Sequence, residues 1–499
     1  MTIFRNQIAS LLTHGEFFQL AHPIWLGSAP GRLDVMGGNV DYTGGTVLQG
    51  VLPKTISAAA QLRSDGMIHI FNPGAQQWGW DTHLEIPLET LADLHAVKQV
   101  CEESPRRLWG KYVLGALYYL HLQHGAFQRS GINLYLHSDL PPNRGVASSA
   151  ALEIAVLKAA SAAHGISLTG LPLAQAGQWL ENVVAGAACG IMDQAAVVMG
   201  EPDSLLPIDC DPCTPHSPLK IPAGWKIWGI DSMASRSTNS SVYETARAAA
   251  FIGYKLICQR EGLTPVLSEE AGLPRWIDPR WHGYLSKIPP SHFRSEYEQW
   301  LPEELPGQRF LAQAWDHLDP FTRIDPTRRY PVRAAVRYAI EENFRVQTVR
   351  ALLQSIPPAD ASSARESLNL VGEIFRQSHY AYRECGLGSD DCDQLIDLAH
   401  RSGFAGAKMT GGGGGGVVAV LGLVEDEPAI HQMAKVFGAS RDSLPSIFTC
   451  CGDPNGRAGS TVLSVKEMNN LWNGSQSSDS SAPINIPHPA FSHESSIEP

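Results

Sequence analysis

The stretch from Gly131 to Ile166, GINLYLHSDLPPNRGVASSAALEIAVLKAASAAHGI, places a strand, a glycine loop and a helix directly after one another. Its first residues alternate between apolar and polar, which predicts a strand, and a Pro/Gly turn follows. The Ala/Leu-rich remainder predicts a long helix. In this arrangement the positive end of the helix dipole points toward any ligand bound in the loop.

Small and hydroxylated residues stand where this helix begins. Gly145 allows the backbone to approach a ligand closely, while the amides and hydroxyls of Ser148 and Ser149 converge on the helix start. This pattern is typical of a phosphate cradle. A plain N-cap, in which the serines satisfy free amides, explains the same residues, so both interpretations stay open for this stretch alone.

Composition and charge narrow the classes of partner. The chain has 499 residues, of which 43% are hydrophobic and 18% charged, and is longer than one core usually supports, so we expect two or three domains. A formal charge of −12 offers no basic surface for nucleic acid or anionic membranes. The first residues read as an amphipathic helix, and no apolar run approaches the about 20 residues of a membrane span. These features predict a cytoplasmic protein with a small-molecule ligand.

Changes in composition divide the chain. An apolar, strand-like run ends in a polar loop near residue 229, which suggests a first domain over 1–228 and a second over 229–468. Pro, Trp and charged residues dominate 261–329, so we expect an insertion of loops and short helices there. Residues 473–499 are rich in Ser, Pro and Asn without Lys or Arg, which predicts a disordered tail.

The six-glycine run 411–416 is a second candidate for ligand contact. It satisfies G-x-G-x-x-G, but the VVAVLGLV after it predicts a strand, whereas a dinucleotide fingerprint opens a helix. A Walker motif is also missing from the sequence. The run is therefore a flexible loop or a backbone lying flat against a substrate or phosphate.

Four charged residues complete the candidate chemistry. Glu181 and Asp193 stand among small and apolar residues, where one could ligate Mg²⁺ together with Ser149 and the other act on a hydroxyl. Arg32 can keep an aspartate ionised, and Asp41 can accept hydrogen bonds from vicinal hydroxyls. Capping, salt bridges and a simple turn remain the alternatives. The residues alone predict a phosphate-handling enzyme of unspecified substrate.

In order along the chain, APGRLDVMGG, LPPNRGVASSAA and GAKMTGGGGGG resemble the three signature motifs of the GHMP small-molecule kinases. GIMDQ, DYTGG and WGKYVLG narrow the resemblance to the galactokinase branch. DPTRRYPVRAAVRYAIEENFRV and CGLGSDDCDQL are similar to the sugar-kinase portion of plant L-arabinokinases. The resemblance covers roughly Pro23 to Val465.

This resemblance implies an α+β, two-domain fold, with a ribosomal-protein-S5-like N-terminal half, a ferredoxin-like C-terminal half and an active site between the halves. It implies transfer of phosphate from ATP to the anomeric hydroxyl of a sugar, with Mg²⁺. Asp193 would be the base or would orient that hydroxyl, and Arg32 would keep it ionised. The implied binding residues are Trp109, Gly145, Val146, Ala147, Ser148, Ser149, Gly412 and Gly413 for ATP, Ser149 and Glu181 for the metal, and Asp41, Gly38, Asn39, Gly190 and Tyr243 for the sugar.

The first motif departs from the galactokinase pattern at Gly38-Asn39, where galactokinases carry Glu-His in contact with the C6 hydroxyl of galactose. Losing a hydrogen bond to a charged group costs about 1.5 to 3 kcal/mol, which weakens the binding of galactose. L-Arabinose has the same ring stereochemistry without C6, so we expect L-arabinose as the substrate. Asn39 could still bond a C6 group, so D-galactose and D-galacturonate stay open, as does a sugar sensor without turnover.

Overall fold

The computed structural model describes residues 2–13, 17–234, 241–314, 316–356, 361–441, 443–450, 461–463 and 467. Its contacts divide the chain into a larger unit, Trp25–Thr461, and a smaller one of Met1–Ile24 with Val462–Pro499. In the smaller unit, α1 (Thr2–Thr13) confirms the expected N-terminal helix. The disordered tail predicted for 473–499 lies outside the described residues, and the domain division at residue 228 stays a prediction.

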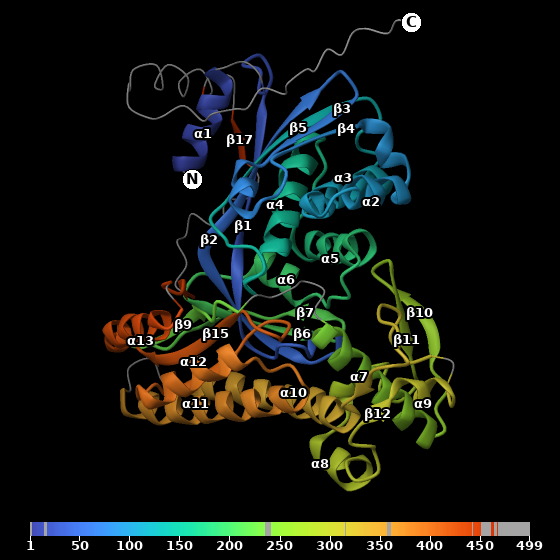
Figure 1. Ribbon diagram of the computed structural model, residues 1–499, viewed down its shortest axis with the longest axis vertical. Coiled ribbons are helices and arrows are strands. Elements are labelled where there is room, and N and C mark those ends of the chain that lie inside the picture. The colour runs from blue at the N-terminus through green and yellow to red at the C-terminus, as the bar shows by residue number, and fades with distance from the viewer. Residues whose placement is uncertain are drawn as a thin grey trace, which may run out of the picture. The chain divides into compact units, whose positions relative to one another are not determined.

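A large, mostly antiparallel sheet carries the first half of the larger unit (Figure 1). Its central strands run in the order β1-β2-β5-β3-β4, with β6 also paired to β2, and only β3 and β5 are parallel among these pairs. The strands are β1 (Ile24–Met36), β2 (Thr46–Arg63), β3 (Met67–Phe71), β4 (His83–Pro87), β5 (Gly131–Ser138), β6 (Ser204–Cys210), β7 (Cys213–Pro215) and β8 (Leu219–Lys220).

Helices pack against this sheet and against one another. They are α2 (Leu94–Glu102), α3 (Gly110–His124), α4 (Ser148–Ala163), α5 (Gly170–Leu180) and α6 (Met192–Met199). Helix α4 contacts β2 as well as α3, α5 and α6. Because many of its residues are alanines, these neighbours can approach it closely. The predicted strand, loop and helix of residues 131–166 are confirmed as β5, the loop and α4.

A second, four-stranded sheet has the order β14-β15-β9-β16. Its strands are β9 (Trp225–Asp231), β14 (Gly406–Met409), β15 (Val417–Leu423) and β16 (Ile447–Thr449). The helices of this half are α7 (Ser241–Arg260), α10 (Val332–Ser355), α11 (Ala361–Glu384), α12 (Asp390–Arg401) and α13 (Glu427–Ala439). The six-glycine run joins the antiparallel neighbours β14 and β15, which confirms that it opens a strand and not a helix.

The segment 261–329 contains more regular structure than expected. Besides short helices, α8 (Pro290–His292) and α9 (Gly307–Leu311), it forms the antiparallel hairpin of β10 (Val266–Glu270) and β11 (Leu273–Ile277), which the sequence analysis missed. A further short pair joins β12 (Leu305–Pro306) to β13 (Arg329–Tyr330). The loop of the β10–β11 hairpin is Ala271-Gly272, and this glycine-containing dipeptide between VLSEE and LPRWI was the available signal.

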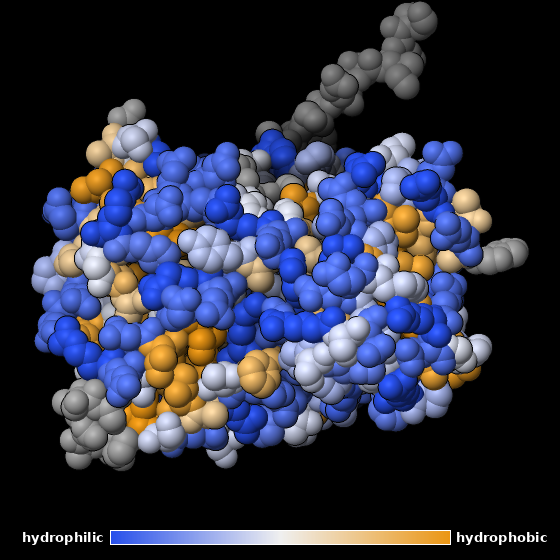
Figure 2. Space-filling model, turned by 90° about the horizontal axis from the view of Figure 1, so that it is seen from below, coloured by the Kyte–Doolittle hydropathy of each residue, from blue (hydrophilic) through white to orange (hydrophobic). Residues whose placement is uncertain are grey.

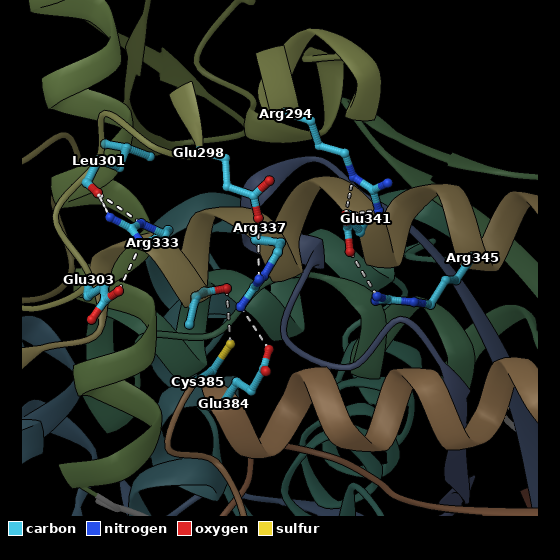
Figure 3. Close-up of polar contacts among 11 residues, drawn as sticks. Arg294, Glu298, Leu301, Glu303, Arg333, Arg337, Glu341, Arg345, Glu384 and Cys385 are labelled. Carbon is cyan, nitrogen blue, oxygen red and sulfur yellow. Dashed lines mark hydrogen bonds and ion pairs between the residues drawn. The ribbon is translucent and has the colours of Figure 1, made fainter. Parts of the chain in front are cut away.

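Ion pairs attach this segment to α10 (Figure 3). Arg294 of the segment bonds Glu341 at 2.7 Å, and Arg333 of α10 bonds Glu303 at 3.0 Å and the Leu301 carbonyl oxygen at 2.7 Å. The exposed pairs among these contribute little stability each. Together they show which side of the segment faces α10.

The molecular face seen from below is mostly hydrophilic, with hydrophobic residues gathered in separate patches (Figure 2). Exposed apolar side chains on α10 and α11 include Phe344 and Leu370. No helix among the described residues combines the length and apolar character that a membrane crossing requires.

We expect Gly27→Ala to destabilise the contact between β1 and α4. An added Cβ would overlap the Ala155 carbonyl oxygen and lie 2.7 Å from the Ala159 amide nitrogen. Overpacking of this kind lowers the free energy of unfolding by about 1 to 3 kcal/mol, which chemical denaturation measures. Gly74→Ala is the control, since its Cβ meets nothing closer than 3.6 Å. Equal denaturation midpoints for the two variants would contradict this packing.

Candidate active site

A cavity of about 490 Å³ in the larger unit collects most of the predicted site residues. Most of its lining comes from residues 32–193, and Tyr243, Glu244 and Gly412 come from later in the chain. The predicted residues that line it are Arg32, Asn39, Asp41, Trp109, Gly145, Ala147, Ser148, Ser149, Glu181, Gly190, Asp193, Tyr243 and Gly412. Gly38, Val146 and Gly413 do not line it.

Arg32 joins two functional elements at the centre of this cavity. Its Nε and Nη2 donate to Asp193 Oδ1 at 2.9 and 2.7 Å, and its Nη1 donates to the Gly145 carbonyl oxygen at 2.6 Å. Strand β1 provides Arg32, the first turn of α6 provides Asp193, and the loop before α4 provides Gly145. One guanidinium thus fixes the predicted catalytic carboxylate relative to the predicted phosphate loop.

The environment of Arg32 keeps it charged. Its side chain is only 3% exposed. Burial opposes the charge, but Asp193 and Asp34 more than offset this and raise the pKa of Arg32 above its ordinary value. A buried positive charge is therefore held at the point where the loop and Asp193 meet.

At the start of α4, next to the loop predicted to bind phosphate, no side chain caps the backbone amides. Helix α4 begins at Ser148, and Ala147 occupies the N-cap position with a left-handed φ of 55° and no side-chain cap. The interpretation of the two serines as N-caps is therefore wrong. Ser149 instead hydrogen-bonds Glu181, which favours the ionised form of that carboxyl. The free amides at the start of α4 remain suited to an anion.

A pair of buried carboxyls lies behind this loop. Gln194 Nε2 donates to Glu181 Oε2 at 2.5 Å and to Glu153 Oε2 at 3.2 Å. Burial, followed by the charge of Asp193, raises the pKa of Glu181 to about 7. Burial, followed by the charge of Glu181, raises the pKa of Glu153. Glu181 lies in a single π-helical turn, Glu181–Ala185, a feature often found at functional sites.

Glu153 was missed as a site residue in the sequence analysis. The signal was a carboxylate in an otherwise Ala- and Leu-rich run, LEIAVLKAA, which implies a partner inside the protein. Only the fold brings Gln194 and Glu181 to it, because they lie on other helices.

The opposite end of the cavity is formed around Asp41. Its side chain is buried, and burial, followed by the charge of Asp193, raises the pKa of Asp41 to about 6. The backbone of Gly190 lies directly against it, since an added Cβ would overlap the Asp41 carboxylate. Tyr243 donates from its hydroxyl to the Ala188 carbonyl oxygen at 2.6 Å. Its predicted contact with sugar stays a prediction.

Gly38 and Asn39 have roles in packing that the sequence did not predict. An added Cβ at Gly38 would overlap Asp34 Oδ2, and the same oxygen accepts from the Gly411 amide at 3.1 Å. Asn39 Nδ2 donates to the Tyr382 hydroxyl at 2.5 Å and to the Gly411 carbonyl oxygen at 3.4 Å. The first motif therefore holds the first residue of the six-glycine loop by both of its peptide groups.

Aromatic side chains line a further part of the cavity. Trp109 is buried and donates from Nε1 to the Asp81 carbonyl oxygen at 3.1 Å. Trp78 and Trp80, which the sequence analysis did not select, line the same end with ring centroids 6.4 Å apart. Flat aromatic surfaces of this kind suit a planar base.

Comparison with known proteins agrees with this arrangement. The family model described as GHMP kinases N terminal domain matches residues 111–201, and the one described as GHMP kinases C terminal matches residues 360–439. The chain belongs to the GHMP kinases. A galactokinase galactose-binding signature also matches residues 13–62, which places this GHMP kinase in the galactokinase branch.

Two relatives and one solved structure define the similarity further. An L-arabinokinase from Arabidopsis thaliana is 32% identical across 87% of this chain, which spans 46% of that longer relative. A galactokinase from Roseiflexus sp. (strain RS-1) is 25% identical across 86% of this chain and 91% of its own length. The crystal structure of Lactococcus lactis galactokinase complexed with galactose aligns with a TM-score of 0.67 at 20% identity, covering 91% of this chain and 99% of the other. The predicted α+β fold of GHMP kinases is thereby confirmed.

The raised pKa of Asp41 predicts a pH-dependent stability difference between wild type and Asp41→Asn. Because the folded pKa of about 6 exceeds the ordinary value of 3.8, the folded state binds the proton more tightly and loses stability as the pH rises through this window. We expect the stability of Asp41→Asn relative to wild type to increase by about 1 kcal/mol from pH 5 to pH 7. Urea denaturation at both pH values measures this.

Asp316→Asn provides the control, because the Asp316 side chain is 63% exposed. A stability difference between wild type and Asp41→Asn that stays constant from pH 5 to pH 7 would show that Asp41 titrates normally.

Proposed function

We propose that this GHMP kinase transfers the γ-phosphoryl group of ATP to the anomeric hydroxyl of a sugar, and that the sugar is L-arabinose. The observation that carries the proposal is the bridge of Arg32 between Asp193 and the Gly145 carbonyl oxygen. It joins a carboxylate able to act on a hydroxyl to a loop suited to phosphates. The relatives named above, an L-arabinokinase and a galactokinase, support sugar phosphorylation.

In this proposal the chain mainly positions the reactants. Asp193 has a side chain that is 25% exposed and lines the cavity, so a sugar hydroxyl can hydrogen-bond to it. Arg32 hydrogen-bonds that carboxylate and presents positive charge where negative charge shifts during transfer. Asp193 accepts the hydroxyl proton or orients the hydroxyl for attack, and both roles need the same geometry.

The residues beside the phosphate loop fit a magnesium ion. Glu181 and Ser149 offer oxygen donors next to the helix N-terminus, and among the described residues no group of three or more His, Cys, Asp or Glu is arranged to hold a metal. Mg²⁺ commonly takes one or two protein oxygens together with substrate phosphates and water, so this donor set suits it. When bound, the ion would neutralise phosphate charge.

The choice of L-arabinose rests on the packing around Gly38. Asp34 Oδ2 occupies the space that a side chain at position 38 would need, and neither Asp34 nor Gly38 lines the cavity, so neither offers a carboxylate to a C6 group. The side-chain amide of Asn39 is engaged by Tyr382 and Gly411. A sugar without a C6 group forgoes no hydrogen bond in such a site. D-Galactose is the second candidate, because the galactokinase galactose-binding signature matches the chain.

A substrate panel tests this proposal. We expect kcat/KM with ATP and Mg²⁺ to be at least about tenfold higher for L-arabinose than for D-galactose or D-galacturonate. Asp193→Ala is the control and removes the activity. Higher kcat/KM for galactose would overturn the assignment of the sugar, and a wild-type protein that phosphorylates none of the three would overturn the catalytic proposal.

The bridging role of Arg32 gives a separate test. We expect Arg32→Lys to lower kcat by about two orders of magnitude, because an ammonium cannot reproduce the fork that contacts both Asp193 and Gly145. Arg294→Lys is the matched control, since the Arg294 side chain is 65% exposed in its pair with Glu341 (Figure 3). Steady-state kinetics that show equal kcat values for both variants would remove Arg32 from the mechanism.

A further inference from the structure

A buried ion pair joins the segment 261–329 to α7. Arg247 Nε and Nη2 donate to the two carboxylate oxygens of Asp319 at 2.8 and 2.9 Å. The two side chains are 4% and 0% exposed. A two-bond contact of this kind fixes the plane of the guanidinium, and removing either partner leaves an uncompensated buried charge.

The remaining guanidinium nitrogen of Arg247, Nη1, contacts the wall of the candidate active site. This nitrogen donates to the Ala188 carbonyl oxygen at 3.0 Å, which also accepts the Tyr243 hydroxyl. Ala188 and Gly190 line the cavity, and Gly190 lies against Asp41. The wall beside Asp41, the part of the cavity proposed to bind the sugar and called the sugar end below, is therefore held by two donors on α7, Tyr243 and Arg247.

The same guanidinium also packs on the element that carries Asp41. It lies 4.7 Å from the ring centroid of Tyr42, the next residue in the chain. On the side of the 261–329 segment, it lies 5.5 Å from the ring centroid of Phe321. One side chain thus contacts both walls of the sugar end and the segment behind them.

Asp319 is itself held in place within its segment. Thr322 Oγ1 donates to Asp319 Oδ2 at 2.6 Å, and the His317 ring shares a hydrogen bond of 2.7 Å with the same hydroxyl. The ion pairs of Figure 3 also connect the segment to α10. The carboxylate therefore has a defined position from which to orient Arg247.

We propose that Asp319 is a positioning residue for sugar binding: through Arg247 it holds the Ala188 carbonyl and Tyr42, and with them Gly190 and Asp41. This gives the segment 261–329 a function in the active site without contact to substrate. The inference rests on the proposed sugar-kinase function.

The test measures the KM values for sugar and for ATP separately. We expect Asp319→Asn to raise the KM for the sugar by about tenfold or more, while the KM for ATP stays within about twofold, because only the sugar end is held by Arg247. Thr322→Val removes one hydrogen bond to Asp319 with little change of shape, so a smaller rise in the same direction is expected. Glu269→Gln, at an exposed position of β10 in the same segment, is the control and leaves both values unchanged.

An unchanged sugar KM in Asp319→Asn overturns the proposal, and so do equal rises in both KM values, which indicate general damage. If Asp319→Asn does not fold, as judged by the loss of thermal stabilisation by ATP, Thr322→Val decides, and an unchanged sugar KM there overturns the proposal. Wild-type turnover is measured first: its absence refutes the sugar-kinase function, whereas wild-type turnover with unaffected variants refutes only the role of Asp319.

Discussion

The active site depends on one buried positive charge, that of Arg32. Asp34, Asp41 and Asp193 lie around it, and Glu181 lies near Asp193. Mutual repulsion and burial disfavour ionisation of such a cluster, as the raised pKa values of Asp41 and Glu181 show. Arg32 contacts Asp193 directly, whereas burial and the charge of Asp193 still disfavour the ionised forms of Asp41 and Glu181.

This electrostatic imbalance explains why the two ends of the cavity can differ. Near the start of α4, Glu181 lies beside Glu153 and hydrogen-bonds Ser149, with which it is proposed to hold the metal. Asp41, which is proposed to bind the sugar, has the charge of Arg247 nearby, and this charge favours its ionised form. These two carboxyl groups thus have different surroundings, which fits the different roles proposed for them.

The sequence predicted those features that are local or that belong to a motif. The strand, loop and helix around Gly145 and the placement of Arg32, Asp193 and Ser149 in one cavity agree with it. It could not predict that Asp34 fills the space beside Gly38, since that depends on how a strand end folds back on itself. It also missed the pairing of Arg247 with Asp319, because 72 residues separate them and only the packed fold brings them together.

The six-glycine loop illustrates a difference between flexibility in a sequence and flexibility in a fold. Glycine has the largest backbone entropy to lose, so a free run of six would resist ordering around a ligand. Here Asp34 and Asn39 hold Gly411, and the Gly414 amide donates to the Leu387 carbonyl oxygen at 3.0 Å. Much of the loop's entropy is thus lost when the chain folds, so Gly412, which lines the cavity, stands in a loop that is already arranged.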